Sequence, residues 1–175
     1  KNHNLSLGFN QPLKRVADST VANLYDLYDA ASIGKTLYEF DVVEQVNIIS
    51  RESHNTRGAI AYGISAARDP QFIVSIPEHI RQYSSELLGF EFYSSRELHG
   101  QVIWFNKSDY CISETFTIHA GRKRYLIDLG ELCANPGLGT PMARINANRL
   151  RIDPTDQNGV EIGIFSLRII EKIKI

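Results

Sequence analysis

The stretch Leu150–Ile169, LRIDPTDQNGVEIGIFSLRI, decides the fold class. Two segments in which apolar and other residues alternate stand on either side of an Asp-Pro turn. Alternation with a period of two is typical of a β-strand that buries one face. It points Leu150 and Ile152 inward and Arg149 and Arg151 outward. We therefore expect the stretch to form the closing hairpin of an antiparallel sheet.

The same period recurs along most of the chain. It predicts about nine or ten short strands separated by turn-rich segments, a pattern typical of an antiparallel sandwich or barrel. Helical crossovers between these segments are absent from the pattern, which argues against a parallel sheet. The segments are TLYEFDVVEQVNIIS (36–50), AIAYGI (59–64), FIVSI (72–76), LLGFEFYS (87–94), QVIWFN (101–106), ETFTIHA (114–120), RYLIDL (124–129), RLRI (149–152) and VEIGIFSLRI (160–169).

The start of the chain has a different period. Between Pro12 and Ile33, apolar residues recur three and four positions apart, which predicts an amphipathic helix or a pair of helices. Pro12 suits the first turn and Gly34 the stop. Residues 1–35 are therefore predicted to be a helical segment or linker, and residues 36–175 the β-domain. The helix either packs on its own domain or serves as a connector or oligomerisation helix.

Composition and charge exclude several classes of protein. Of the 175 residues, 43% are hydrophobic and 22% charged, which is enough apolar side chain for one substantial core. The 19 basic and 20 acidic residues give a net charge of −1, so no global field favours nucleic acid. No segment reaches the roughly 20 apolar residues of a membrane span. The chain lacks an initiator Met, and we interpret it as a piece of a longer protein.

Cys111 and Cys133 are the two cysteines of the chain. They are too few for a disulfide framework, and their spacing matches no zinc or redox motif. We expect two buried thiols, with a single disulfide as the alternative.

Several motifs, taken in order, resemble a known family of domains. The chain is similar to galactose-binding-like jelly rolls, the carbohydrate-binding-module-type domains attached to bacterial glycosyltransferases and glycoside hydrolases. In these domains an Asp-Pro pair opens an apolar strand, a Trp follows a short apolar run, and a Y-x-I-D-L strand precedes an L-R-x-D-P strand. The matching residues are Asp69, Pro70, Trp104, Tyr125, Ile127, Asp128, Leu129, Leu150, Arg151, Asp153 and Pro154.

The resemblance covers roughly residues 36–170 and implies a jelly-roll β-sandwich without catalytic activity. It implies a saccharide or polysaccharide as ligand, and other domains of the same bacterial polypeptide, plausibly a glycosyltransferase, as partners. A homo-oligomer and a cytoplasmic or membrane-associated location are further expectations. The segment NPGLGTPMARINA (135–147) departs from the pattern, because it lacks the aromatic residue that such domains often carry there. The alternative function is an interaction domain that positions a neighbour or forms an oligomer without binding sugar.

Five residues are the candidates for contact with a saccharide. Trp104, the only tryptophan, either stacks its ring on a sugar from an outer or concave face or fills the core. Glu91 and Tyr93 lie on the polar side of one predicted strand, and Thr117 and His119 on that of another. Carboxylates, hydroxyls and imidazoles beside an aromatic ring are what sugar binding needs. We expect these polar residues to share one sheet.

The turn DPTDQNG (153–159) holds the candidate metal ligands. Asp153 and Asp156 offer carboxylate oxygens to one structural calcium ion, although calcium requires about six to eight oxygen ligands. Alternatively, the Asx side chains bond to nearby backbone N–H groups and no metal is bound. In that case Arg151 and Asp153, which share a strand face, pair with neighbours on the adjacent strand.

No catalytic motif stands out. The five histidines form no H-x-H or H-E-x-x-H pattern, and G-x-S-x-G is absent. Glu52 and His54 are the best acid/base pair that the spacing offers, without an identifiable third partner. We therefore expect that this domain is not an enzyme and has no cofactor beyond the candidate calcium ion.

Overall fold

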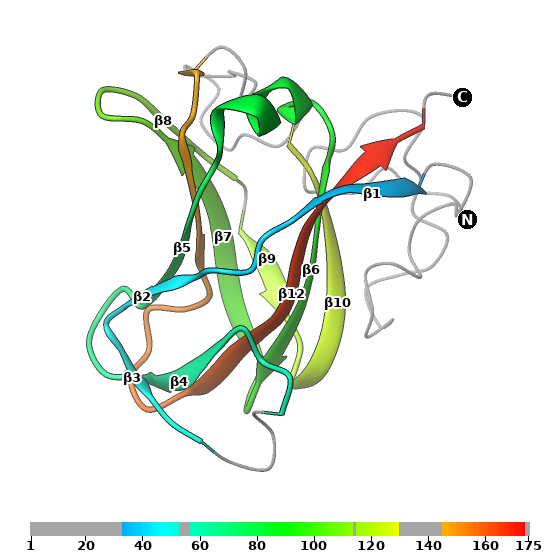
Figure 1. Cartoon of the computed structure of the whole chain (residues 1–175). Helices are drawn as coiled ribbons and strands as arrows, with labels where there is room; N and C mark the ends of the chain where they lie inside the picture. The colour runs from blue at the N-terminus through cyan, green and yellow to red at the C-terminus, as the bar shows by residue number, and fades with distance from the viewer. Residues whose placement is uncertain (1–32, 53–56, 114, 130–144, 174–175) are drawn as a thin grey trace.

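A computed structural model describes residues 33–52, 57–113, 115–129 and 145–173, and these form two facing antiparallel β-sheets (Figure 1). The first sheet contains, in order, β10 (Gly121–Asp128), β6 (Leu87–Ser94), β12 (Glu161–Lys172), β4 (Ala61–Ser65) and β3 (Ile48–Ser50), and β1 (Ile33–Glu39) pairs with β12. The second contains β2 (Glu44–Val46), β5 (Gln71–Ser75), β11 (Arg149–Asp153), β7 (Leu98–Phe105) and β8 (Tyr110–Ile112), and β9 (Phe116–Ile118) pairs with β7. The short 3₁₀ helix Glu78–Tyr83 connects β5 to β6.

The chain passes back and forth between the two sheets. From β4 onward, β4, β6, β10 and β12 belong to the first sheet, and β5, β7 and β11 alternate with them in the second. This order confirms the predicted antiparallel jelly-roll sandwich.

The predicted closing hairpin is wrong. β11 pairs with β5 and β7, whereas β12 pairs with β1, β4 and β6, so the segment between them crosses from one sheet to the other. Both strands bury side chains in the same core, from opposite sides. β11 alternates strictly, whereas the alternation of β12 shifts by one residue between Ile164 and Ser166. Periodicity therefore predicts the inward face of β11 correctly and leaves its hydrogen-bonded neighbours undetermined.

Side chains from both sheets meet in one core. Phe90 and Phe92 of β6 are buried, while Glu91 and Tyr93 alternate to the outer side, as the sequence predicts. Leu150 and Ile152 of β11 are likewise buried, and the arginines of that strand point outward. The expected alternation is therefore present in both sheets.

Trp104 is a core residue, with 0% of its surface exposed. Its β7 neighbour Val102 is also buried in the core, so the residues between and beyond them, Ile103 and Phe105, face outward. Of the two alternatives for Trp104, the structure shows the packing role. Its ring is not available to stack on a saccharide.

The predicted helix lies mostly outside the described residues, which begin at Ile33. Ile33 and Gly34 belong to β1, so Gly34 is not a helix stop, and the β-structure begins before the predicted boundary at Thr36. Within the described part of the chain, no helix is long and apolar enough to cross a membrane.

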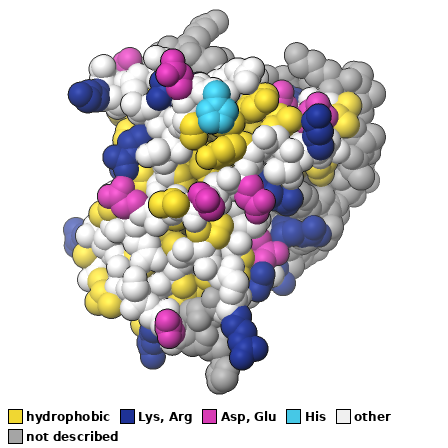
Figure 2. Space-filling view, in the orientation of Figure 1, with side chains coloured by type: hydrophobic (Ala, Val, Ile, Leu, Met, Phe, Trp, Pro, Cys, Tyr) yellow, Lys and Arg dark blue, Asp and Glu magenta, His cyan; other side chains and the backbone are white. Residues whose placement is uncertain are grey.

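Acidic and basic side chains are interspersed on the molecular surface. Figure 2 shows both signs scattered over one face, around a patch of hydrophobic side chains, with no large area of a single sign. On this face recognition therefore depends on local groups, as the net charge predicts.

The buried position of Trp104 has a measurable consequence. Truncation of a buried aromatic side chain costs about 3–5 kcal/mol, so Trp104→Ala is expected to lower the free energy of unfolding by about that amount in urea titrations. Wild-type tryptophan emission should be blue-shifted and protected from acrylamide. Ile49→Ala, a truncation at a side chain that is 65% exposed, is the control and should have little effect. Red-shifted, quenchable emission from the native protein would contradict the core position.

Candidate functional site

The outer face of the second sheet carries the groups best suited to bind a ligand. Arg149 of β11 lies opposite Phe105 of β7, which in turn lies opposite Tyr110 of β8. One step along the strands, Arg151, Ile103 and Ile112 form a second row. Cross-strand neighbours on one face are about 5 Å apart, so aromatic, aliphatic and cationic side chains adjoin here.

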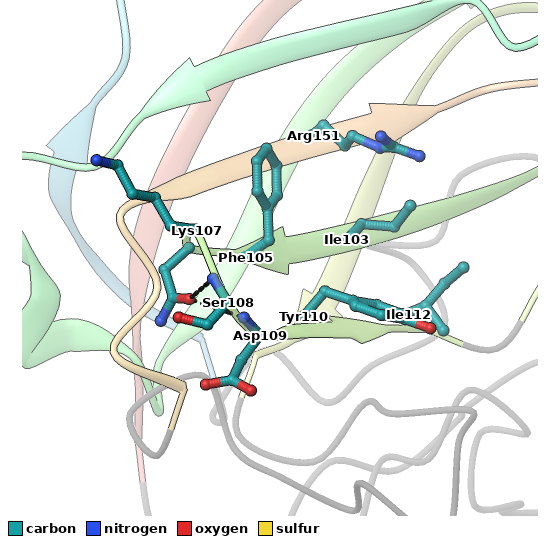
Figure 3. Close-up of a pocket in the computed structure, with 9 residues that line it drawn as sticks. Ile103, Phe105, Lys107, Ser108, Asp109, Tyr110, Ile112 and Arg151 are labelled. Carbon is teal, nitrogen blue, oxygen red and sulfur yellow. Dashed lines mark hydrogen bonds between the residues drawn. The ribbon is translucent and has the colours of Figure 1, made fainter.

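A cavity of about 400 Å³ opens on this face at the β7–β8 turn. Figure 3 shows Phe105 and Ile103 standing on the same side of β7, with Arg151 beside them and Tyr110 and Ile112 along β8. Its size is within the usual range for small-molecule sites. The lining residues are Ile103, Phe105, Asn106, Lys107, Ser108, Asp109, Tyr110, Ile112 and Arg151.

Asn106 shapes the turn that closes one end of the cavity. Its side-chain Oδ1 accepts hydrogen bonds from the backbone N–H groups of Ser108 and Asp109, both at 2.8 Å. Its Nδ2 donates to the backbone carbonyl of Ile145, which ties the turn to the segment before β11. An Asx turn of this kind fixes the local backbone. The lining residues Lys107 and Asp109 are thereby held at the rim.

Tyr110 gives the cavity an exposed aromatic surface. Its exposed fraction is 54%. Among the large hydrophobic side chains that are exposed in the described residues, Tyr110 is the aromatic one. Phe105, which lies opposite it in the β7–β8 pair, is half-buried. An exposed ring next to a half-buried ring offers a flat apolar surface beside the polar turn.

Arg151 lines the cavity, and Asp153 is its ion-pair partner on the same strand. Arg151 Nη2 lies 2.8 Å from Asp153 Oδ2, so the two residues that were predicted to share a face pair with each other. Asp153 Oδ1 is buried and has no hydrogen-bond partner among the described residues. Burial raises the pKa of Asp153 from 3.8 to about 6, Arg151 opposes that rise, and the carboxylate of Asp69 adds to it. The carboxylate is therefore ionised at some cost.

The sequence-predicted site residues do not come together. Trp104 is in the core, and Glu91 and Tyr93 lie on the outer side of the first sheet. Thr117 is in β9, which belongs to the second sheet, and His119 follows it directly. The expectation that the polar candidates share one sheet is therefore wrong, because the chain crosses from the first sheet to the second between β6 and β7.

Glu91 and Tyr93 already have partners within the protein. Glu91 Oε2 lies 2.5 Å from Nε of Arg122, and the ring of Tyr93 stacks on Tyr62 with 5.9 Å between centroids. Tyr62 in turn covers Gly163, where a Cβ atom would lie 2.3 Å from the Tyr62 ring. This face of the first sheet is therefore held together by its own contacts.

The predicted calcium site has no third carboxylate among the described residues. Asp153 is bound to Arg151, and Asp156 is exposed in the turn. The described residues contain no group of three or more His, Cys, Asp or Glu side chains placed to hold a metal. The buried Ser65 instead secures this turn, because its hydroxyl donates to the carbonyl of Gln157 at 2.7 Å and accepts from the Val160 N–H at 2.9 Å.

Cys111 is buried and disulfide-bonded. The chain has only one other cysteine, Cys133, which lies outside the described residues. The expectation of two thiols is therefore wrong, and the disulfide alternative is correct. Since Cys111 lies between Tyr110 and Ile112 in β8, the bond anchors the edge strand that lines the cavity.

Sequence analysis missed Phe105, Tyr110 and the cavity as a whole. Phe105 could have been predicted from the alternation of side chains along β7, because Phe105 must face outward if Trp104 lies in the core. Tyr110 had no comparable signal, since β8 is only three residues long.

Comparison with known proteins gave only distant likenesses. No family model and no curated protein matches the chain. Among solved structures, "Carbohydrate binding module family29" has a TM-score of 0.48 at 12% identity, covering 79% of this chain and 86% of that one. "BiXyn10A CBM1 APO" has a TM-score of 0.39 at 12% identity, covering 79% and 99%. Likenesses at this level concern the path of the chain and say nothing about a ligand.

The raised pKa of Asp153 predicts a specific pH dependence of stability. Between about pH 4 and 6 the folded protein keeps a proton on Asp153 that the unfolded chain has lost, so the free energy of unfolding falls as the pH rises. The fall should be on the order of 1–2 kcal/mol.

Urea denaturation at pH 4.5 and pH 7 tests this dependence. Asp153→Asn should show a flatter profile than the wild type, whereas Asp156→Asn, with the same change at an exposed position, should keep the wild-type profile. Parallel profiles for the wild type and Asp153→Asn would contradict the assignment.

Proposed function

We propose that this chain is a non-catalytic carbohydrate-binding domain whose ligand site is the outer face of the second sheet. The observation that carries the proposal is the open cavity in which the exposed Tyr110 ring and Phe105 adjoin Arg151 and the polar Asn106 turn. Sugars present apolar C–H surfaces and many hydroxyls. A site that combines aromatic rings with planar polar groups suits both.

The charges on this face support binding rather than catalysis. The carboxylates of Asp153 and Glu44 are each bound to an arginine, at 2.8 and 2.6 Å. A glycosidase requires two carboxyl groups that face each other across the scissile bond, one of which supplies a proton. Carboxylates committed to neighbouring arginines serve instead to hold those arginines in place.

Family resemblance supports an accessory role for the domain. The motifs from Asp69-Pro70 to Asp153-Pro154, on a jelly-roll order of strands, resemble those of domains attached to bacterial glycan-active enzymes. We infer that the domain places such an enzyme, for example a glycosyltransferase, on its polysaccharide. The disulfide at Cys111 favours an oxidising compartment over the cytoplasmic location expected from the sequence.

Binding to a glycan array, followed by calorimetry on each hit, tests the proposal. Tyr110→Ala should weaken binding about tenfold or more, since loss of a ring contact near 1.4 kcal/mol corresponds to that factor. Tyr110→Phe keeps the ring and should bind nearly as well as the wild type.

Tyr93→Ala examines the site that the sequence predicted on the first sheet. We expect its affinity to be unchanged, provided that thermal denaturation shows a folded protein. Loss of binding in Tyr93→Ala but not in Tyr110→Ala would move the site to the first sheet. A silent array with the folded wild type would overturn the proposal and favour the alternative, an interaction domain.

A further inference from the structure

Two arginines on β11 keep unused hydrogen-bond donors at the proposed site. Arg149 Nη2 binds Glu44 Oε2, and Arg151 Nη2 binds Asp153 Oδ2. The Nε atoms of both arginines are shielded from water and have no partner among the described residues. A guanidinium group has five N–H donors. The Nη groups of the same two arginines, whose side chains are 39% and 26% exposed, are the donors that a ligand can reach.

A second cavity adjoins the first on the same face. It measures about 340 Å³ and is lined by Arg149 together with Tyr38, Phe40, Asp41, Val42, Glu44, Ile73, Ser75 and Pro77. Arg149 lies opposite Phe105 of the first cavity, with its Cζ atom 5.9 Å from the centroid of the Phe105 ring. The two cavities therefore meet at the Arg149–Phe105 contact, and each contains one of the two arginines.

The chemistry of these arginines favours a carboxylate ligand. The planar guanidinium fork matches a carboxylate in a bidentate geometry, which a neutral hydroxyl cannot reproduce. The cationic side chains that line the first cavity are Lys107 and Arg151, the carboxylate in its lining is that of Asp109, and Asp153 is paired with Arg151. Glu44 Oε2, 2.6 Å from Arg149 Nη2, holds that arginine in place, which reduces the conformational entropy lost on binding.

Given that this face binds saccharide, as proposed above, we propose that its ligand is an acidic saccharide, a chain containing uronic acids, whose carboxylate is bound by Arg151. A neighbouring sugar of the same chain lies in the second cavity, where Arg149 and the carboxylates of Asp41 and Glu44 contact its hydroxyl groups. The rings of Phe105 and Tyr110 contact the apolar faces of the sugars. The inference names the class of ligand, and its failure can be told apart from failure of the binding site itself.

Asp153 and the ligand compete for Arg151, which makes binding depend on pH. Arg151, Asp69 and, from β7, the facing Gln101 are the groups around Asp153. As the pH falls below about 6, Asp153 gains a proton and releases Arg151, while a sugar carboxylate stays ionised. Affinity for the acidic chain should therefore rise severalfold between pH 7.5 and pH 5.5.

Calorimetry with tetragalacturonate and its fully methyl-esterified form tests the inference, because esterification removes the carboxylate charges and keeps the sugar backbone. The free acid should bind the wild type at least tenfold more tightly than the ester. Arg151→Gln should remove that preference and leave binding of the ester. Arg122→Gln is the matched control, an ion-paired arginine on the first sheet, and should keep the preference.

Because Arg151→Gln leaves Asp153 without its partner, the double variant Arg151→Gln/Asp153→Asn provides a second, neutral form of the site. It should also lose the preference for the acid and its pH dependence. Equal affinity for acid and ester, both weakened by Tyr110→Ala, would overturn the inference and leave the proposed binding site intact. Binding of neither probe, with a neutral glycan bound at Tyr110, would overturn it equally. If the folded protein binds no glycan at all, both the inference and the proposed function are overturned.

Discussion

The inward orientation of Trp104 is the constraint on which the second sheet and its ligand face depend. In the strand pairing, Trp104 lies opposite Leu150 of β11 and Cys111 of β8, and both of these residues are buried. A strand alternates its side chains, so this one large buried ring directs Ile103 and Phe105 to the outside. The residue that was the first candidate for stacking on a sugar therefore shapes the proposed binding face indirectly, by occupying the core behind it.

The ion pair between Arg151 and Asp153 on the outer face of β11 contributes little to the stability of the fold. Ion pairs in a partly buried position gain little net free energy, because desolvation offsets the attraction. The raised pKa of Asp153 and the unpartnered Nε of Arg151 are signs of that desolvation. Groups kept in an unfavourable state often mark functional sites. Here the strain lies at the centre of the sheet, on the strand that separates the two cavities.

Much of the fold could be predicted from local pattern. The alternation of Phe90 and Phe92 with Glu91 and Tyr93 established a strand and its buried side before any tertiary information. Pairing could not be predicted in the same way. Several strands had equivalent inward faces, so the neighbour of β11 was undetermined, and a crossover between sheets was mistaken for a hairpin. The turn after β11 depends on Ser65, which is distant in sequence.

By itself, the amino-acid sequence determined that the chain forms antiparallel strands, and which side chains within each strand share a face. For β7, whose two faces are both apolar, the tertiary structure decided which face is the core. It also decided that Thr117 and Glu91 lie on different sheets, whereas Phe105, Tyr110 and Arg151 adjoin one cavity. The physical reason is that alternation is a local property of the extended backbone. The choice between inside and outside depends on burial against the opposite sheet, which is contributed by residues far along the chain.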